Sequence, residues 1–260
     1  MACITLLSDF GLQDASVAAA KGILMQYTEG LGIVDISHEI NPFNTKQAAY
    51  LLASAYKNFP QGTCHVLAFD IFYEPIPKLV LTTYNDHYFL APDNGIIPLA
   101  LPEAIERSWL LFELTKEQTF ADWMARAGKA ISILQTKKPE QQGLPAHKLK
   151  PSKETTVTVN DAATIACEVM HIDRYENVIL NITKQQFENM GRGRRFRLEI
   201  MQVEEITEIS NGYNDVREGN KLCRFNSNGY LEICVNRGNA ASLFGFRLNS
   251  RYNDIKLIFE

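Results

Sequence analysis

The sequence predicts an α/β N-terminal domain with a mostly parallel sheet, followed by a smaller all-β, barrel-like C-terminal domain. Short apolar runs alternate with helical patterns over residues 1–136, which is typical of parallel α/β sheets. Residues 137–154 shift to Lys, Pro, Gln and Ser, as a linker would. Residues 155–260 instead show alternating strand patterns and Asn-Gly turns.

In the first domain the opening run at 4–7 is apolar and branched enough to be a buried strand, and a turn leads from it into a helical pattern. Similar reasoning predicts strands at 33–36, 64–70, 79–83 and 88–91 and helices at 17–24, 46–59 and 115–135. In the second domain, strand and turn patterns lie at 155–161, 166–182, 194–202, 221–236 and 254–260.

Composition excludes several classes of function. A net charge of −4 over 260 residues argues against a nucleic-acid partner, and the basic residues at 192–197 are better read as a solvated strand end or interface. No apolar run reaches the ~20 residues that cross a bilayer, and no signal peptide is evident, so no membrane partner is expected.

Cysteine and motif patterns give no cofactor site. The five cysteines form no CxxC pair, which indicates free thiols in a reducing cytoplasm rather than zinc ligands or disulfides. The histidines show no ligand pairing, and neither a dinucleotide fingerprint nor a P-loop occurs. We therefore expect no metal and no cofactor.

The first candidate site residue is Asp9, which follows the opening strand. Ligands of α/β sheets bind at the carboxyl ends of the strands, so Asp9 in SDFG is placed to meet one. Asp9 and Asp14 could equally cap the turn. The residues alone leave both interpretations open.

Five segments, taken in order, resemble one family. SDFGLQDASVAAAKG, DISHEINPFNTKQAAYLL, FLAPDNGI, HIDRYENVILNI and NSNGYLEICVNRGNAA are similar to the signatures of the S-adenosylmethionine (SAM) hydroxide adenosyltransferases, whose superfamily includes a nucleoside fluorinase and chlorinase. The resemblance spans nearly the whole chain. It implies a homotrimer with sites between the N-terminal domain of one subunit and the C-terminal domain of the next. The implied reaction is attack of water or hydroxide on the ribose C5′ of SAM, giving adenosine and methionine.

The resemblance also implies which residues contact this adenosyl ligand. Asp9 would grip the ribose diol, because a carboxylate accepts hydrogen bonds from two hydroxyls. Phe43 would present its ring to the ribose or adenine. Further ligand contacts are implied for Asp14 and Ser16 near the methionine, Asn94 in FLAPDNGI, Asp173 at the methionine ammonium, Tyr175 and Asn177 near the adenine and the methionine, Ser227 at the methionine carboxylate, and Asn236 and Arg237 at the adenine edge.

The water-activating set departs from the family pattern of Asp, Arg and His. Asp70 is present, but Pro77 stands where the Arg is expected. The segment that carries the His in the family pattern has no histidine here and reads Thr119-Phe120-Ala121-Asp122. Lys78 could restore the positive charge as a point charge, and Asp122 could serve as a substitute base. The predicted catalytic residues are therefore Asp70, Lys78 and Asp122.

Three functions stay open at this point, one of which is an enzyme that uses a different nucleophile or a different adenosyl substrate, because the altered loop at 73–78 would face the reacting carbon. The chain is expected to hydrolyse SAM, because a sulfonium is already an activated leaving group and placement of water supplies much of the rate. The alternative is a catalytically weakened or inactive module that binds SAM or adenosine, since the expected Arg and His are missing.

Overall fold

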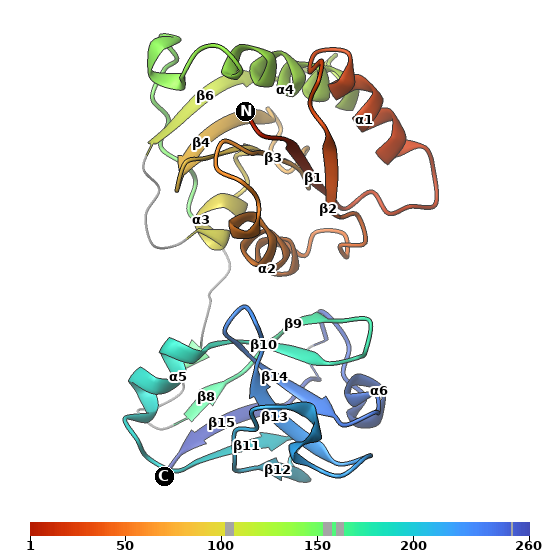
Figure 1. The fold of residues 1–260 in the computed structure, drawn as a ribbon, viewed down its shortest axis with the longest axis vertical. Coiled ribbons are helices and arrows are strands. Elements are labelled where there is room, and N and C mark those ends of the chain that lie inside the picture. The colour runs from red at the N-terminus through yellow and green to blue at the C-terminus, as the bar shows by residue number, and fades with distance from the viewer. Residues whose placement is uncertain (102–106, 153–157, 160–163, 251) are drawn as a thin grey trace. The chain divides into compact units, whose positions relative to one another are not determined.

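The computed structural model describes residues 1–101, 107–152, 158–159, 164–250 and 252–260. Its contacts divide the chain into two units, Met1–Glu154 and Thr155–Glu260, each with its own core (Figure 1). Among the described residues, no helix is both long and apolar enough to span a membrane.

The first unit is built on a six-stranded sheet of order β2-β1-β3-β5-β4-β6. Neighbours β2, β1, β3 and β5 run parallel, whereas β4 is antiparallel to both β5 and β6. The mostly parallel sheet is therefore confirmed. The strands are β1 (Ile4–Ser8), β2 (Ile33–Ser37), β3 (Cys64–Ala68), β4 (Lys78–Tyr84), β5 (His87–Pro92) and β6 (Arg107–Glu113).

Helices cover both faces of this sheet (Figure 1). Strands β1 and β3 are buried along their whole length, because a parallel strand covered on both sides is apolar throughout. One face carries α1 (Ser16–Met25) and α4 (Phe120–Leu134), and the other carries α2 (Thr45–Ala55) and α3 (Ile96–Ala100). Two short 3₁₀ turns, Tyr56–Asn58 and Pro139–Gln141, complete the unit's helical segments.

The predicted linker at 137–154 packs on the first unit over its described part. Leu110 N donates to Pro145 O at 3.1 Å, and His147 N donates to Ser108 O at 2.9 Å, so this segment extends the sheet edge at β6. Residues 153 and 154 lie outside the described residues.

The second unit holds two antiparallel sheets, of orders β13-β14-β10-β9 and β12-β11-β15-β8-β7. The all-β character is confirmed, but the described strands do not close into a barrel, because these two sheets share no strand. The strands are β7 (Thr158–Val159), β8 (Thr164–Ala166), β9 (Val169–Ile172), β10 (Val178–Thr183), β11 (Phe196–Ile200), β12 (Glu204–Ile206), β13 (Lys221–Phe225), β14 (Tyr230–Val235) and β15 (Ile255–Phe259).

Short helices complete this unit: α5 (Lys184–Gly191), α6 (Ala240–Phe244) and the 3₁₀ turn Tyr213–Asp215. Of the strand predicted at 155–161, only residues 158 and 159 lie within the described residues. The apolar side chains of both sheets form one core, with Leu180, Leu198 and Ile233 fully buried.

Candidate active site

A chain of polar side chains that runs from the buried Ser8 and His38 to the surface holds the turn after β1. Ser8 Oγ lies 2.6 Å from His38 Nδ1, and His38 Nε2 lies 3.1 Å from Asp35 Oδ1. Asp35 in turn pairs with Lys21 at 2.6 Å, while Gly11 N donates to His38 O at 2.8 Å. This order of groups resembles a hydrolase triad, but Ser8 is 0% exposed, so it cannot meet a substrate. This series of polar contacts therefore positions the turn after β1.

Asp9, at this turn, lies beside Asp70. Strands β1 and β3 are parallel neighbours, so their carboxyl ends meet at one edge of the sheet. Asp70 N donates to Asp9 Oδ2 at 3.4 Å. Burial raises the pKa of both carboxyls, and the charge of Asp70 raises the pKa of Asp9 further. The edge thus concentrates two partly buried carboxylates.

Asn94 fixes the backbone that carries Asp70. Its Nδ2 donates to Phe69 O at 3.0 Å and to Asp70 O at 3.5 Å, and its Oδ1 accepts from Ile96 N at 3.2 Å. The amide thereby ties the end of β3 to the turn after β5. Asn94 acts on the site through Asp70 as well as by lining it.

A pocket of about 450 Å³ opens at this edge. Two of its residues have left-handed backbones, Phe43 with φ 65° and Asp70 with φ 44°. Such strain in residues other than glycine persists only where surrounding contacts impose it, and it is common at functional sites. The Phe43 side chain is held out in solvent, 77% exposed. The lining residues are Phe43, Thr45, Asp70, Phe72, Tyr73, Asn94 and Ser152.

The other predicted residues of this unit are not among the residues that line the pocket. Asp9 adjoins the pocket through its hydrogen bond with Asp70 N. Asp14 Oδ1 accepts a hydrogen bond from Ser16 N at 2.8 Å at the start of α1. Hydrogen bonds from the backbone and the side chain of Ser16 lower the pKa of Asp14. Lys78 Nζ pairs with Glu113 at 3.2 Å across β4 and β6.

Asp122 lies in the capping box of α4. Its Oδ2 accepts from Thr119 N at 2.7 Å and from Thr119 Oγ1 at 2.9 Å. These bonds lower the pKa of Asp122. A carboxylate so occupied is a weaker base than Asp70, whose pKa burial raises.

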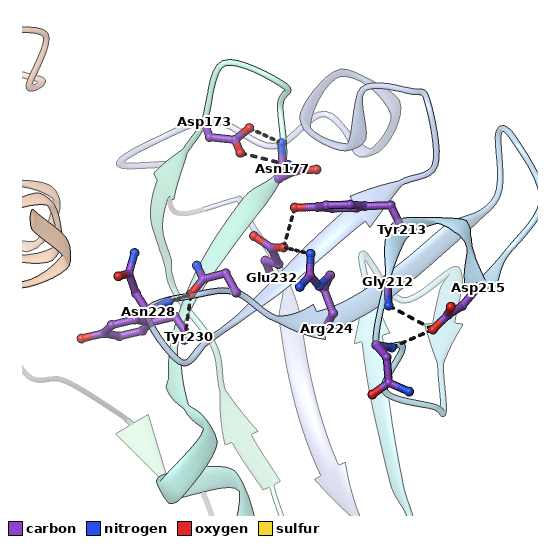
Figure 2. A network of polar contacts seen from close by, with 11 residues as sticks. Asp173, Asn177, Gly212, Tyr213, Asp215, Arg224, Asn228, Tyr230 and Glu232 are labelled. Carbon is purple, nitrogen blue, oxygen red and sulfur yellow. Dashed lines mark hydrogen bonds and ion pairs between the residues drawn. The ribbon is translucent and has the colours of Figure 1, made fainter. Parts of the chain in front are cut away.

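In the second unit, Asp173 and Asn177 form one closed turn (Figure 2). Asp173 Oδ1 accepts from Tyr175 N and Asn177 N, at 2.8 and 2.9 Å, and Oδ2 accepts from Asn177 Nδ2 at 2.9 Å. Glu176 adopts φ 60°, a left-handed conformation that favours glycine, and its carboxylate accepts from Ser242 N at 2.9 Å. Glu176 therefore links this turn to the start of α6.

A second pocket, of about 670 Å³, adjoins this turn. It brings together four predicted residues, Tyr175, Asn177, Asn236 and Arg237. Asn236 Nδ2 also donates to Val216 O at 2.8 Å, which fixes its side chain. Ser227 is exposed and is not part of the lining, and Asp173 contributes only through the turn it closes. The lining comprises Arg174, Tyr175, Asn177, Tyr213, Val235, Asn236, Arg237, Gly238 and Asn239.

Tyr213 is the lining residue that the sequence did not suggest. Its hydroxyl donates to Glu232 at 3.1 Å, and Arg224 lies over its ring at 4.6 Å (Figure 2). Glu232 is 3% exposed, and burial raises its pKa. Burial of Tyr213 and the negative charge of Glu232 raise the pKa of Tyr213 to about 12. Tyr213 is thus a fixed, neutral ring at the pocket wall. The Asn-Gly pair before it signalled only a turn.

Comparison with known proteins assigns the two units to one family. Family models for the SAM hydroxide adenosyltransferase N-terminal and C-terminal domains match residues 4–143 and 167–253. The chain belongs to the SAM hydroxide adenosyltransferase family. The (R)-S-adenosyl-L-methionine hydrolase of Methanocaldococcus jannaschii is 30% identical, over 98% of this chain and 95% of its own length. The protein of that name from Thermus thermophilus is 28% identical, over 94% and 96%.

A solved structure has the same fold. An uncharacterized conserved protein from Thermotoga maritima superposes with a TM-score of 0.81 at 25% identity, covering 99% of this chain and all of that one. The resemblance found in the sequence words is therefore confirmed for the family and for the fold. In the described part of this family member, no three His, Cys, Asp or Glu side chains converge as a metal site would require.

Proposed function

We propose that this protein hydrolyses SAM to adenosine and methionine. The observation that carries the proposal is the pairing of Asp9 and Asp70 at the carboxyl edge of the parallel sheet, beside a pocket with aromatic walls. Relatives that match over nearly the whole chain bear the name SAM hydrolase. Both lines of support concern the same reaction.

The pockets offer what an adenosyl ligand needs. A carboxylate at Asp9 suits the ribose diol, because each charge-assisted hydrogen bond is worth about 1.5–3 kcal/mol. The ring of Phe43 offers an apolar face to the nucleoside, and in the second unit the rings of Tyr175 and Tyr213 do the same beside the amides of Asn177 and Asn236.

The remaining predicted contacts suit the methionine part of SAM. Asp173 already accepts three hydrogen bonds, yet a carboxylate has about four acceptor sites, so one is left for an ammonium. Asp14 and Ser16 at the start of α1, and the exposed Ser227, are proposed for the polar end of the amino acid, whereas Arg237 is proposed, with Asn236, for the adenine edge.

In the proposed reaction a water oxygen attacks the ribose C5′. The C5′–S bond breaks with its electron pair going to sulfur, which leaves methionine as a neutral thioether, and the proton of water passes to a base. Asp70 is the proposed base and orienting group, because its carboxyl lies at the pocket and burial raises its pKa. Lys78 and Asp122 stay secondary candidates.

We further propose that no resident metal or cofactor takes part, since the sulfonium is its own leaving group. The five cysteines, all within the described residues, are free, which supports a reducing cytoplasmic location.

We propose that the working unit is a homotrimer in which each site uses the first unit of one copy and the second unit of another. The wide exposure of Phe43 and Tyr175, 77% each, supports burial of these rings on assembly. The test is complementation: Asp9→Asn and Tyr213→Ala variants are co-expressed. Shared sites should restore about a quarter of the wild-type rate, because each half is intact with even odds. No recovery on mixing would place both halves in one copy.

The activity itself is tested by incubating the protein with SAM and separating the products by chromatography. Adenosine and methionine should appear in equal amounts. Asp70→Ala should slow their release most strongly, and Lys78→Ala and Asp122→Ala less. Tight SAM binding with no product would instead indicate a binding module. Unchanged rates in all three variants would remove the catalytic assignment.

A further inference from the structure

A segment that follows the residues matched by the N-terminal family model, 4–143, crosses the first unit beside the pocket. This strap, defined as residues 145–152, begins by pairing with β6 through Pro145 and His147. It ends at Ser152, which lines the 450 Å³ pocket. The strap therefore connects the far sheet edge with the proposed active site.

Asp93 anchors the middle of the strap. Its carboxylate is 5% exposed and is shared by two strap residues: His147 Nε2 lies 2.7 Å from Oδ2, and Lys150 N donates to Oδ1 at 2.9 Å. A side-chain Cβ at Gly95 would lie 2.9 Å from Ser152 Cα, so the strap packs directly on glycine backbone. Asn94, between these two contacts, holds Phe69 O and Asp70 O.

From this anchored position the Lys150 side chain reaches the loop 70–77. Its Nζ lies 2.6 Å from Glu74 Oε1, with side chains 40% and 33% exposed. Glu74 follows Phe72 and Tyr73, both of which line the pocket. The ion pair therefore grips the loop next to its pocket-facing residues.

The loop 70–77 is held by the core at its start and is more exposed further along. Ile71 is 5% exposed and belongs to the core of the first unit, and Tyr73 N donates to Asp70 O at 3.2 Å. Beyond Tyr73, Pro75 and Pro77 have no N–H to donate, and Ile76 is 53% exposed. The ion pair of Lys150 with Glu74 adds a tether from outside in this more exposed part of the loop.

We propose that Lys150 is a positioning residue, which acts through Glu74 to hold the loop 70–77 in the conformation that lines the pocket. The part of this proposal that concerns turnover rests on the proposed function. Lys150 does not line the pocket, so it acts on loop geometry and not on the ligand. Loss of the tether should lower kcat by up to about fivefold, because a partly exposed ion pair changes the population of the productive loop conformation by about that factor. KM should change less than about threefold.

The test compares Lys150→Met and Glu74→Gln with a matched control, Lys148→Met. Lys148 is an exposed lysine of the same strap, without a carboxylate partner among the described residues. Amide hydrogen exchange of residues 70–77, followed by mass spectrometry, should quicken about fivefold in the first two variants, as expected for a partly exposed ion pair. It should stay unchanged in the control. The charge-swapped double variant, Lys150→Glu with Glu74→Lys, should restore both exchange and kcat.

The outcomes separate this proposal from the function. If the wild type releases no adenosine, the proposed function fails while hydrogen exchange still decides whether Lys150 holds the loop. If the wild type is active but Lys150→Met behaves like Lys148→Met in exchange and kcat, the positioning role is wrong. A charge-swapped variant as impaired as the single variants would also overturn it, because the effect would then not pass through the pair.

Discussion

Replacing Asp9 by Asn tests the ligand site most directly, because stability and binding should respond differently. The side chain keeps its shape, and one amide oxygen can still accept from Asp70 N, a bond that is already long at 3.4 Å. Burial and the charge of Asp70 both oppose ionisation of Asp9. Removing the charge therefore relieves an unfavourable contribution to folding.

The sign of the pH effect follows from the raised pKa. A carboxyl whose pKa is higher in the folded state contributes stability that is present below its unfolded pKa and is lost as the pH rises through the folded pKa. At pH 7 wild-type Asp9 is thus a liability to folding, and the Asn variant should be as stable as the wild type or more so. The loss of one weak hydrogen bond limits any decrease to about 1 kcal/mol.

Binding should change in the opposite direction. The variant replaces one acceptor oxygen by an NH₂ donor and turns the remaining bond from charge-assisted into neutral. Together these changes remove about 2–4 kcal/mol, or about thirty- to a thousandfold in the Kd for adenosine. Protonation of Asp9 removes the same charge as the substitution. Because the pKa of Asp9 is raised, the affinity of the wild type for adenosine should begin to fall, as the pH is lowered, at a higher pH than an ordinary aspartate would give.

Isothermal titration with adenosine and thermal unfolding measure the two effects. Asp86→Asn is the matched control, since Asp86 is an exposed aspartate with φ 60° in the β4–β5 turn, at the opposite edge of the sheet. It should alter neither quantity. If Asp9→Asn bound adenosine within threefold of the wild type, or melted well below it, Asp9 would be a structural cap and the assignment would be wrong.

Three further predictions concern folding and chemistry. Burial, and then the charge of the neighbouring His87, lower the pKa of His65 to about 3. The contribution of His65 to the free energy of unfolding should therefore be complete above about pH 6.5 and should fall as the pH is lowered toward 3. Urea unfolding at about pH 7 and about pH 4.5 should show this decrease, and the decrease should be smaller in the His65→Gln variant. Glu232→Ala should lower the free energy of unfolding by about 3 kcal/mol, since it leaves Arg224 unpaired, whereas Glu232→Gln should lower it less in the same denaturation assay. Dialysis against EDTA should leave the rate of adenosine release unchanged, and a loss restored by a divalent cation would refute the cofactor-free reaction.

The sequence predicted the parts of the fold that depend on local pattern. Strands β1 and β3 read as continuous apolar runs because both their faces are covered, and Asp9 could be placed at the sheet edge from the strand that precedes it. The described strands of the second unit form two sheets and not a closed barrel; the sequence could not decide this, because closure depends on which distant strands pair, and alternation within a strand does not specify its partner.

The contacts of the site residues could likewise be predicted where they are local in the sequence, and not where they join distant segments. The spacing of Thr119 and Asp122 fits a capping box, and the structure uses it so, although Asp122 was predicted as a base. Lys78 meets Glu113 only because β4 and β6 pair in a particular register, and Lys150 meets Glu74 across 76 positions of chain. Such contacts between distant residues have no signature in one sequence.

The trio of Ser8, His38 and Asp35, in which the serine is fully buried, has a practical consequence for anyone who sorts enzymes by geometric templates. A search based on interatomic distances alone would select this chain as a serine hydrolase, since the spacings of 2.6 and 3.1 Å are appropriate. Fluorophosphonate probes should nevertheless leave the native protein unlabelled, because the hydroxyl is sealed beneath the fold. Accessibility therefore has to be part of any such template before chemistry is assigned from it.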